Sequence, residues 1–124
     1  MRLRRLRLWG SYELGPNGKE TVLHAFTGSP DDGEGPQAGL LRDRAGHFYG
    51  TTMIGGTSDR GTVFKMDRRG RLRLLHSFMN TDGLWPSSTL VQGTDGSLYG
   101  TTQAGGDLSC DNGYGCGVVF RITP

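Results

Sequence analysis

The sequence predicts an all-β protein made of short antiparallel strands, and three observations lead to that prediction. Glycine and proline together supply 27 of the 124 residues, well above their usual share of about 12%. Long helices tolerate few glycines, so this composition excludes a helical bundle. Apolar residues make up 34% of the chain and gather in short runs bounded by glycine, as in strands joined by tight turns. The third observation is an internal repeat of about 50 residues.

The repeat is visible as motifs that recur in the same order along the chain. Five pairs of motifs are separated by 50 to 56 residues, so the insertions fall in loops. They are Leu-His-x-Phe at 23–26 and 75–78, Asp-Gly at 32–33 and 82–83, Tyr-Gly-Thr-Thr at 49–52 and 99–102, Gly-Gly at 55–56 and 105–106, and Gly-x-Val-Phe at 61–64 and 117–120.

Each period contains four expected strands, which are seen best at 71–78, 88–92, 97–102 and 117–123. The Asp95-Gly96 pair marks a hairpin between the second and third strands, because glycine accepts a positive φ. Four antiparallel strands in about 40–50 residues are the signature of a β-propeller blade. Apolar residues on both faces of several strands suit blades stacked face to face.

The repeats also define the expected domain organisation. Residues 9–124 hold about two and a half repeats, which are too few to close a propeller of at least about four blades. The sequence therefore predicts an incomplete propeller, a fragment of a longer array. Its parts are a segment outside the repeat at 1–8, a partial blade at 9–14, and repeats at 19–66 and 71–123.

The charge of the chain is unevenly distributed. The net charge is +2, but four arginines lie within residues 1–8, and without them ten basic residues face twelve acidic ones. This segment is expected to be a solvated or non-native tail, with non-specific phosphate binding as the alternative. The body is not expected to bind nucleic acid specifically. No apolar run is long enough for a membrane helix or a signal peptide.

The string Tyr99–Gly106, followed by the Gly-x-Val-Phe strand, resembles the GloVer tandem repeat of bacterial choice-of-anchor proteins. Leu-His-Ser-Phe at 75–78, followed by Asp82-Gly83 and Pro86, resembles it too. The resemblance covers residues 9–124 and implies a β-propeller-like array that is secreted or held at the cell surface. It implies no reaction. Residues 1–8 match no part of the repeat, and the export and anchoring segments of the family are missing.

Three kinds of residue suggest chemistry but are better explained by structure. His24 and His76 occupy equivalent strand positions, which diverge between successive blades, so they are expected to be packed histidines rather than metal ligands. His47 is expected in a solvated turn. The threonine pairs at 51–52 and 101–102 have no neighbouring base and are expected to be structural.

The loops rich in glycine and acidic residues allow two interpretations. Asp31, Asp32, Glu34 and Asp82 offer oxygen ligands for calcium, but their spacing does not match a known calcium loop. Asp-Gly turn chemistry is the favoured interpretation. The Gly-Gly pairs are expected to form turns, because the lysine and helix of a phosphate-binding loop are absent. No cofactor is expected.

Cys110 and Cys116 are the chain's two cysteines, and five residues separate them. Two thiols are too few for a zinc site. A disulfide that closes a glycine-rich hairpin and two free thiols in a reducing cytosol remain as alternatives. The exported family that the sequence resembles favours the disulfide.

The predicted function is a non-enzymatic binding or structural module of a bacterial secreted or cell-surface propeller. It is expected to bind a carbohydrate ligand or a protein, and the loops at 27–36, 79–86 and 107–116 are the candidate site. Carbohydrate is the expected ligand class, because Trp85 and Tyr114 are expected to be exposed aromatic rings on which sugars stack. The alternatives are a fragment of a polysaccharide-degrading enzyme and a truncated gene piece without a separate function. We also expect a marginally stable monomer that self-associates through open blade faces. The candidate ligand-binding residues are Asp32, Asp82, Trp85, Asp111 and Tyr114.

Overall fold

The computed structural model describes residues 2–5, 10–14, 18 and 20–124, and the described chain is all-β, as predicted. A single short 3₁₀ turn, η1 (Asp111–Gly113), interrupts the described strands. In chain order these strands are β1 (Arg2–Arg5), β2 (Gly10–Leu14), β3 (Glu20–Ala25), β4 (Gly33–Glu34), β5 (Leu41–Arg42), β6 (Phe48–Thr52), β7 (Ile54–Gly55), β8 (Thr62–Met66), β9 (Leu72–Ser77), β10 (Leu84–Pro86), β11 (Val91–Gln92), β12 (Leu98–Ala104) and β13 (Val119–Ile122).

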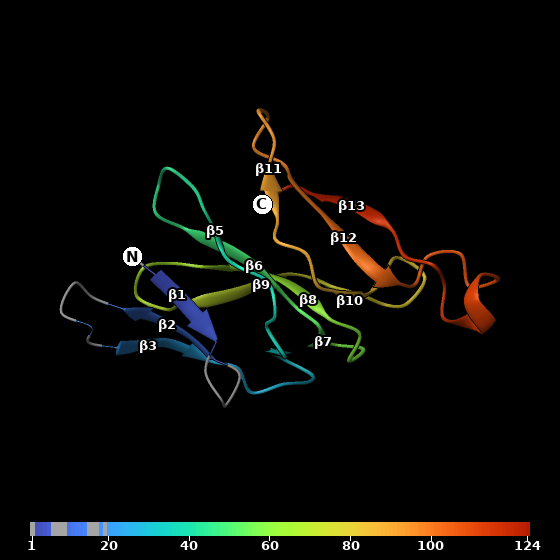
Figure 1. Cartoon of the computed structure of the whole chain (residues 1–124), viewed down its shortest axis with the longest axis horizontal. Helices are drawn as coiled ribbons and strands as arrows, with labels where there is room; N and C mark the ends of the chain where they lie inside the picture. The colour runs from blue at the N-terminus through green and yellow to red at the C-terminus, as the bar shows by residue number, and fades with distance from the viewer. Residues whose placement is uncertain (1, 6–9, 15–17, 19) are drawn as a thin grey trace.

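The central element is a four-stranded antiparallel sheet in the order β5-β6-β8-β9 (Figure 1). Within it, Phe48 lies opposite Met66 and Thr52 lies opposite Thr62. The turns between its strands are tight: the Gly46 N–H donates to Asp43 O at 3.2 Å, and the Gly70 N–H donates to Asp67 O at 3.0 Å. These are the turns that the glycine-bounded sequence pattern predicts.

The boundaries of the sheets differ from those of the sequence repeats. Strand β9 is the first strand of the repeat at 71–123, yet it pairs with β8 of the preceding repeat. Strand β3 pairs with β2 in the same way, and both pairs have a bulge, between Ser11 and Tyr12 and between Val63 and Phe64. Each sequence repeat therefore contributes its first strand to the sheet of the repeat before it.

The last sheet has β12 at its centre. Strands β11 and β13 flank one half of β12, and β10 pairs with its other end, where Leu84 lies opposite Ala104. The equivalent pair in the first repeat is β4 with β7, where Glu34 lies opposite Ile54. These two- and three-residue strands were not predicted, because they are too short to show a period. None of the sheets described here closes on itself.

The arginine-rich start of the chain contains a strand. Residues Arg2–Arg5 form β1, which pairs antiparallel with β2 and places Arg2 opposite Leu14. The sequence did not predict this strand. Its residues, Arg-Leu-Arg-Arg, alternate only over the first three positions, which is too short a run to show the period of a strand. Trp9 and the other residues between β1 and β2 lie outside the described residues.

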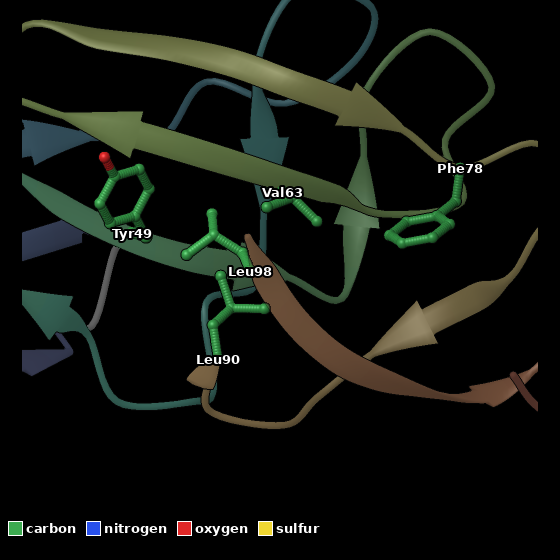
Figure 2. Close-up of a cluster of buried hydrophobic side chains, with 5 residues drawn as sticks. All are labelled: Tyr49, Val63, Phe78, Leu90 and Leu98. Atoms are coloured by element: carbon green, nitrogen blue, oxygen red, sulfur yellow. The ribbon is translucent and has the colours of Figure 1, made fainter. Parts of the chain in front are cut away.

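The hydrophobic core lies between sheets. Tyr49 and Val63 of the central sheet form one buried cluster with Leu90 and Leu98 of the next repeat and with Phe78 (Figure 2). A second buried cluster joins Phe26, which follows β3, to residues of the central sheet, namely Phe48, Phe64 and Met66. The sheets therefore bury their faces against one another.

The glycine of each Tyr-Gly-Thr-Thr motif makes room for this packing. A Cβ atom at Gly50 would approach the Phe64 ring and the Leu40 side chain to 2.7 Å each. At Gly100 it would approach Phe120 to 2.5 Å and Leu90 to 2.8 Å. Both distances are shorter than van der Waals contact, so a side chain at either position would displace the core.

No helix in the described part of the chain has the length and apolar character that crossing a membrane requires.

Candidate ligand-binding site

The two Asp-Gly loops share a framework of hydrogen bonds. His24 Nε2 lies 2.9 Å from Asp32 Oδ2, and His76 Nε2 lies 2.7 Å from Asp82 Oδ2. Asp32 also accepts bonds from the backbone N–H groups of Thr27, at 3.0 Å, and Gly33, at 2.8 Å. The ring of each histidine lies edge-on to the phenylalanine two residues later. The histidines are thus packed strand residues with a bonded ring nitrogen, as the sequence predicts.

These contacts bear on two candidate ligand-binding residues. Asp32 is buried, and its carboxylate accepts hydrogen bonds from backbone N–H groups of its own turn, so it is not an exposed loop side chain. Asp82 serves its own turn by accepting from the Met79 N–H at 2.8 Å as well as from His76. Within the described residues, no group of three or more histidine, cysteine or acidic side chains is placed to hold a metal ion.

The paired threonines and glycines are also structural. Thr52 Oγ1 donates to Ile54 O at 2.9 Å, and Thr102 Oγ1 donates to Ala104 O at 2.8 Å. These bonds fix the bend at which the Tyr-Gly-Thr-Thr strand turns towards the loop. Gly55 and Gly105 follow with φ of +89° and +82°, a conformation that favours glycine.

A buried tyrosine anchors the turn at residues 43–47. The Tyr49 hydroxyl donates to Asp43 Oδ2 at 2.9 Å, and His47 Nδ1 lies 3.3 Å from the same oxygen. Burial raises the pKa of Asp43, but the bonds from the His47 N–H and the Tyr49 hydroxyl outweigh burial and hold it below its usual value. Burial, together with the bond to Asp43, raises the pKa of Tyr49 to about 12.

The loop at 107–116 is six residues longer than its equivalent at 57–60 in the first repeat. Cys110 and Cys116 are joined by a disulfide, with their Cα atoms 5.6 Å apart. The Gly115 N–H donates to Cys110 O at 3.0 Å, and the Gly105 N–H donates to Tyr114 O at 2.7 Å. The disulfide and these two bonds hold Tyr114 in place beside the end of β12.

Tyr114 stacks on Trp85 beside a cavity of about 280 Å³. The two ring centroids are 5.9 Å apart, and the ring planes are inclined by 29°. Tyr114 is 56% exposed, whereas Trp85 is half-buried rather than exposed as expected. The cavity is close in size to the smallest ligand pockets, about 300 Å³. We call this cavity the Trp85 pocket. It is lined by Arg60, Asn80, Leu84, Trp85, Asn112, Gly113 and Tyr114.

The Trp85 pocket contains an unpaired buried acceptor. Asn80 Oδ1 is buried and has no hydrogen-bond partner. The backbone of Asn80 is fully used, since its N–H donates to Gly83 O at 3.1 Å and its carbonyl accepts from the Gly106 N–H at 2.9 Å. An unpaired buried acceptor costs about 1–3 kcal/mol. Because Asn80 Oδ1 is closed to solvent, a ligand hydroxyl recovers that free energy only if the Asn80 side chain turns towards the pocket.

One residue of this pocket has a strained backbone. Trp85 has a φ of +58°, which costs a residue with a large side chain about 1–2 kcal/mol relative to its ordinary conformations. Asn80 and Asn112 also have positive φ, of +83° and +54°, but asparagine adopts this conformation readily. Strained residues gather at sites where a side chain must be held in a particular position.

The preceding repeat completes the pocket. Arg60 follows β7, and its carbonyl accepts a bond from the Trp85 N–H at 3.2 Å. Sequence reasoning found Trp85 and Tyr114 because aromatic residues in glycine-rich loops stand out. It missed Arg60 and Asn80, for which the sequence carries no signal beyond an Asn-x-Asp-Gly turn. Asp111 is exposed in the long loop but does not line the pocket.

Fold and site together define an all-β tandem-repeat protein whose loops form a pocket between successive repeats. The model of the Gloeobacter/Verrucomicrobia repeat family matches residues 9–124, and the chain belongs to this family. The match confirms the resemblance seen in the repeated motifs. No curated protein and no solved structure matches the chain.

Proposed function

We propose that the chain is a non-enzymatic repeat module that binds carbohydrate in the Trp85 pocket. The observation that carries the proposal is the stacked pair of Trp85 and Tyr114 beside the unpaired Asn80 Oδ1. Rigid aromatic side chains supply a large contact area, and a few placed polar atoms orient the ligand.

The chemistry of a sugar matches the chemistry of this pocket. A pyranose ring has apolar C–H faces that pack on an aromatic ring, and hydroxyl groups that donate hydrogen bonds. Asn80 Oδ1 is an acceptor without a donor, so a sugar hydroxyl fits it better than a second acceptor would. Asn112 adds a further amide to the lining.

The lining residues favour binding over polysaccharide degradation in this proposal. Glycoside hydrolysis usually needs two carboxyl groups that face the bond to be cleaved. The side chains that line the Trp85 pocket include a guanidinium, two amides and two aromatic rings, without a carboxyl group. The carboxylates of Asp32 and Asp82, the residues on which the enzyme alternative would depend, are bonded to histidines.

We further propose that the module works outside the cytoplasm, as a secreted or cell-surface protein. The disulfide between Cys110 and Cys116 supports this proposal, because disulfides persist in oxidising compartments. The disulfide holds the loop that carries Tyr114, so the proposed binding site depends on the same environment.

A glycan array followed by calorimetric titration of the full chain tests the carbohydrate proposal. The array identifies glycans that bind, and Trp85→Ala and Tyr114→Ala are expected to weaken their affinity at least tenfold, about 1.4 kcal/mol. Tyr99→Ser is the matched control, because Tyr99 is a partly exposed aromatic residue outside the pocket. Absence of binding to every glycan, or equal loss in all three variants, contradicts the proposal.

A second proposed function is docking of another sheet on the outer face of the last sheet. Val91, Tyr99 and Val119 are exposed large apolar residues. Val91 lies opposite Tyr99, and Val119 lies opposite Thr101, two residues further along β12. Their sequence equivalents in the first repeat are Leu41, Tyr49 and Val63, which pack against the following repeat. We propose that a second copy of this chain covers the exposed face.

Sedimentation at micromolar concentration tests the docking proposal. The chain is expected to associate, and Val119→Lys is expected to weaken association by placing a charge on the face. Met79→Lys is the control, because Met79 is exposed and apolar but lies outside β11–β13. A monomeric wild-type chain, or equal effects of both variants, contradicts the proposal.

A further inference from the structure

Arg60 gives the Trp85 pocket a positive charge that stacking of a neutral sugar does not use. It is the cationic side chain among the residues that line the pocket. Its backbone carbonyl bonds to the Trp85 N–H, so the residue is fixed to the aromatic part of the site. Its side chain is exposed, and the guanidinium makes no ion pair with any residue that the structure describes.

The carboxylates of Asp59 and Asp82, which lie close in sequence to residues that line the pocket, are already bonded. Asp59 Oδ1 accepts from Ser29 Oγ and from the Gly55 N–H, each at 2.9 Å. Asp82 accepts from His76 and from the Met79 N–H. The Arg60 guanidinium is exposed and makes no ion pair with a described residue, so it is available to a ligand. Its planar set of donors matches the two oxygens of a carboxylate.

We infer that the ligand is an acidic sugar that presents a uronic acid unit to this pocket. The inference rests on the proposed carbohydrate function and names its substrate class. The uronate carboxylate pairs with the Arg60 guanidinium, and the pyranose ring packs on the aromatic pair of Trp85 and Tyr114. The side-chain amides of Asn80 and Asn112, which line the pocket, pair with ring hydroxyls. Each chemical group of the pocket is then matched by one group of the ligand.

The position of Arg60 makes this selectivity a property of two adjacent repeats. Arg60 belongs to the loop after β7, whereas Asn80, Trp85 and Tyr114 belong to the following repeat. Recognition of the acidic group and stacking of the ring therefore come from different repeats. A substitution at Arg60 changes the charge of the pocket and leaves the aromatic pair and its disulfide-bonded loop in place.

The test is calorimetric titration with trisaccharides of galacturonate and of glucuronate, each beside its carboxyl-reduced counterpart. The wild-type chain is expected to bind at least one uronide tenfold or more tightly than the reduced sugar. Arg60→Gln is expected to remove this preference, measured as the ratio of the affinities for the uronide and the reduced sugar in the same variant. Arg60→Lys is expected to keep part of it, because lysine keeps the charge but not the planar pair of donors. Arg69→Gln, which removes an exposed charge from another turn, is the control and is expected to change nothing.

The outcomes separate this inference from the proposed function. Equal binding of acidic and reduced sugars, or an unchanged preference in Arg60→Gln, overturns the uronate inference while carbohydrate binding stands. A preference that Arg69→Gln reduces equally reflects net charge alone and also overturns it. Failure of the wild-type chain to bind any sugar overturns both. Melting curves of each variant establish that the chain remains folded during the titrations.

Discussion

The loops that begin at Asp32 and Asp82 occupy equivalent places in successive repeats, but their contents differ. Both aspartates bond to a strand histidine, and both loops form a short ladder, Glu34 with Ile54 and Leu84 with Ala104. Fifty residues separate Gly35 from Trp85, and their φ values are +72° and +58°. The second loop therefore holds a tryptophan in a conformation that the first assigns to glycine.

The difference between these loops indicates where function lies in the repeat. The hydrogen-bond framework is common to both repeats and serves folding. The second repeat adds Trp85, the six extra residues of its long loop and a disulfide, and these additions build the pocket. An aromatic side chain at a glycine position costs stability, so the protein gives up folding free energy to hold a side chain there.

The two faces that carry Tyr49 and Tyr99 form a second comparison. Tyr49 is 3% exposed and Tyr99 is 37% exposed, although each begins a Tyr-Gly-Thr-Thr motif. Val63 is fully buried, whereas its equivalent Val119 is 79% exposed. The same residue is thus core or surface according to whether another sheet covers it.

The largest expected effect on stability distinguishes the buried Tyr49 from the exposed Tyr99. Tyr49→Ala is expected to lower the free energy of unfolding by about 3–4 kcal/mol, because it leaves a cavity between the sheets. Tyr99→Ala is expected to lower it by less than about 1 kcal/mol, because surface substitutions remove little packing. Denaturant unfolding of both variants checks the pair, and equal losses would contradict the assignment of these two faces.

The disulfide gives the next effect in size. Replacement of Cys110 and Cys116 by alanine is expected to lower the free energy of unfolding by about 2 kcal/mol, the entropy of closing so short a loop. Glycan affinity is expected to fall as well, because Tyr114 loses its fixed position. Unfolding and titration with and without reductant check this, since the reductant should affect wild type alone. Unchanged affinity in the double variant would contradict the role given to the loop.

The hydrogen bond between Tyr49 and Asp43 predicts a loss of stability in alkali. The folded-state pKa of Tyr49 is raised to about 12, above the usual value of about 10. Below pH 10 the protonated Tyr49 hydroxyl makes its full contribution to the free energy of unfolding. This contribution disappears between pH 10 and 12, because the tyrosine loses its proton at a lower pH in the unfolded chain than in the folded one. At pH 11 the loss is about 1.4 kcal/mol. Denaturant unfolding of wild type and Tyr49→Phe at pH 9 and pH 11 checks this prediction. Between the two pH values the variant should lose less unfolding free energy than wild type, by the amount given above. An equal loss in both proteins would contradict the prediction.

Much of the fold was predictable because its signals are local. Glycine-bounded runs such as 97–102 indicate strands, and the ordered motifs indicate the repeat. The sheet boundaries were not predictable, because nothing in residues 71–78 marks that β9 pairs backwards with β8. The strand at Arg2–Arg5 was not predictable, because one leucine among three arginines shows no strand period.

The candidate site was predictable only in part, for a physical reason. Trp85 and Tyr114 stand out as large aromatic residues in loops where turns favour small ones. Arg60 joins them only through tertiary structure, since its repeat packs beside theirs. The unpaired atom of Asn80 depends on what surrounds it, and no residue type or spacing encodes that.

The most direct test of the central claim, that Trp85 occupies a glycine position for the sake of the pocket, is the unfolding free energy of Trp85→Gly relative to Trp85→Ala. Both variants lose the aromatic ring, but glycine relieves the left-handed strain that alanine keeps. After the extra entropy of glycine in the unfolded chain, Trp85→Gly should be the more stable by about 0.5–1 kcal/mol. The reverse order, which is usual for glycine against alanine, would contradict the account.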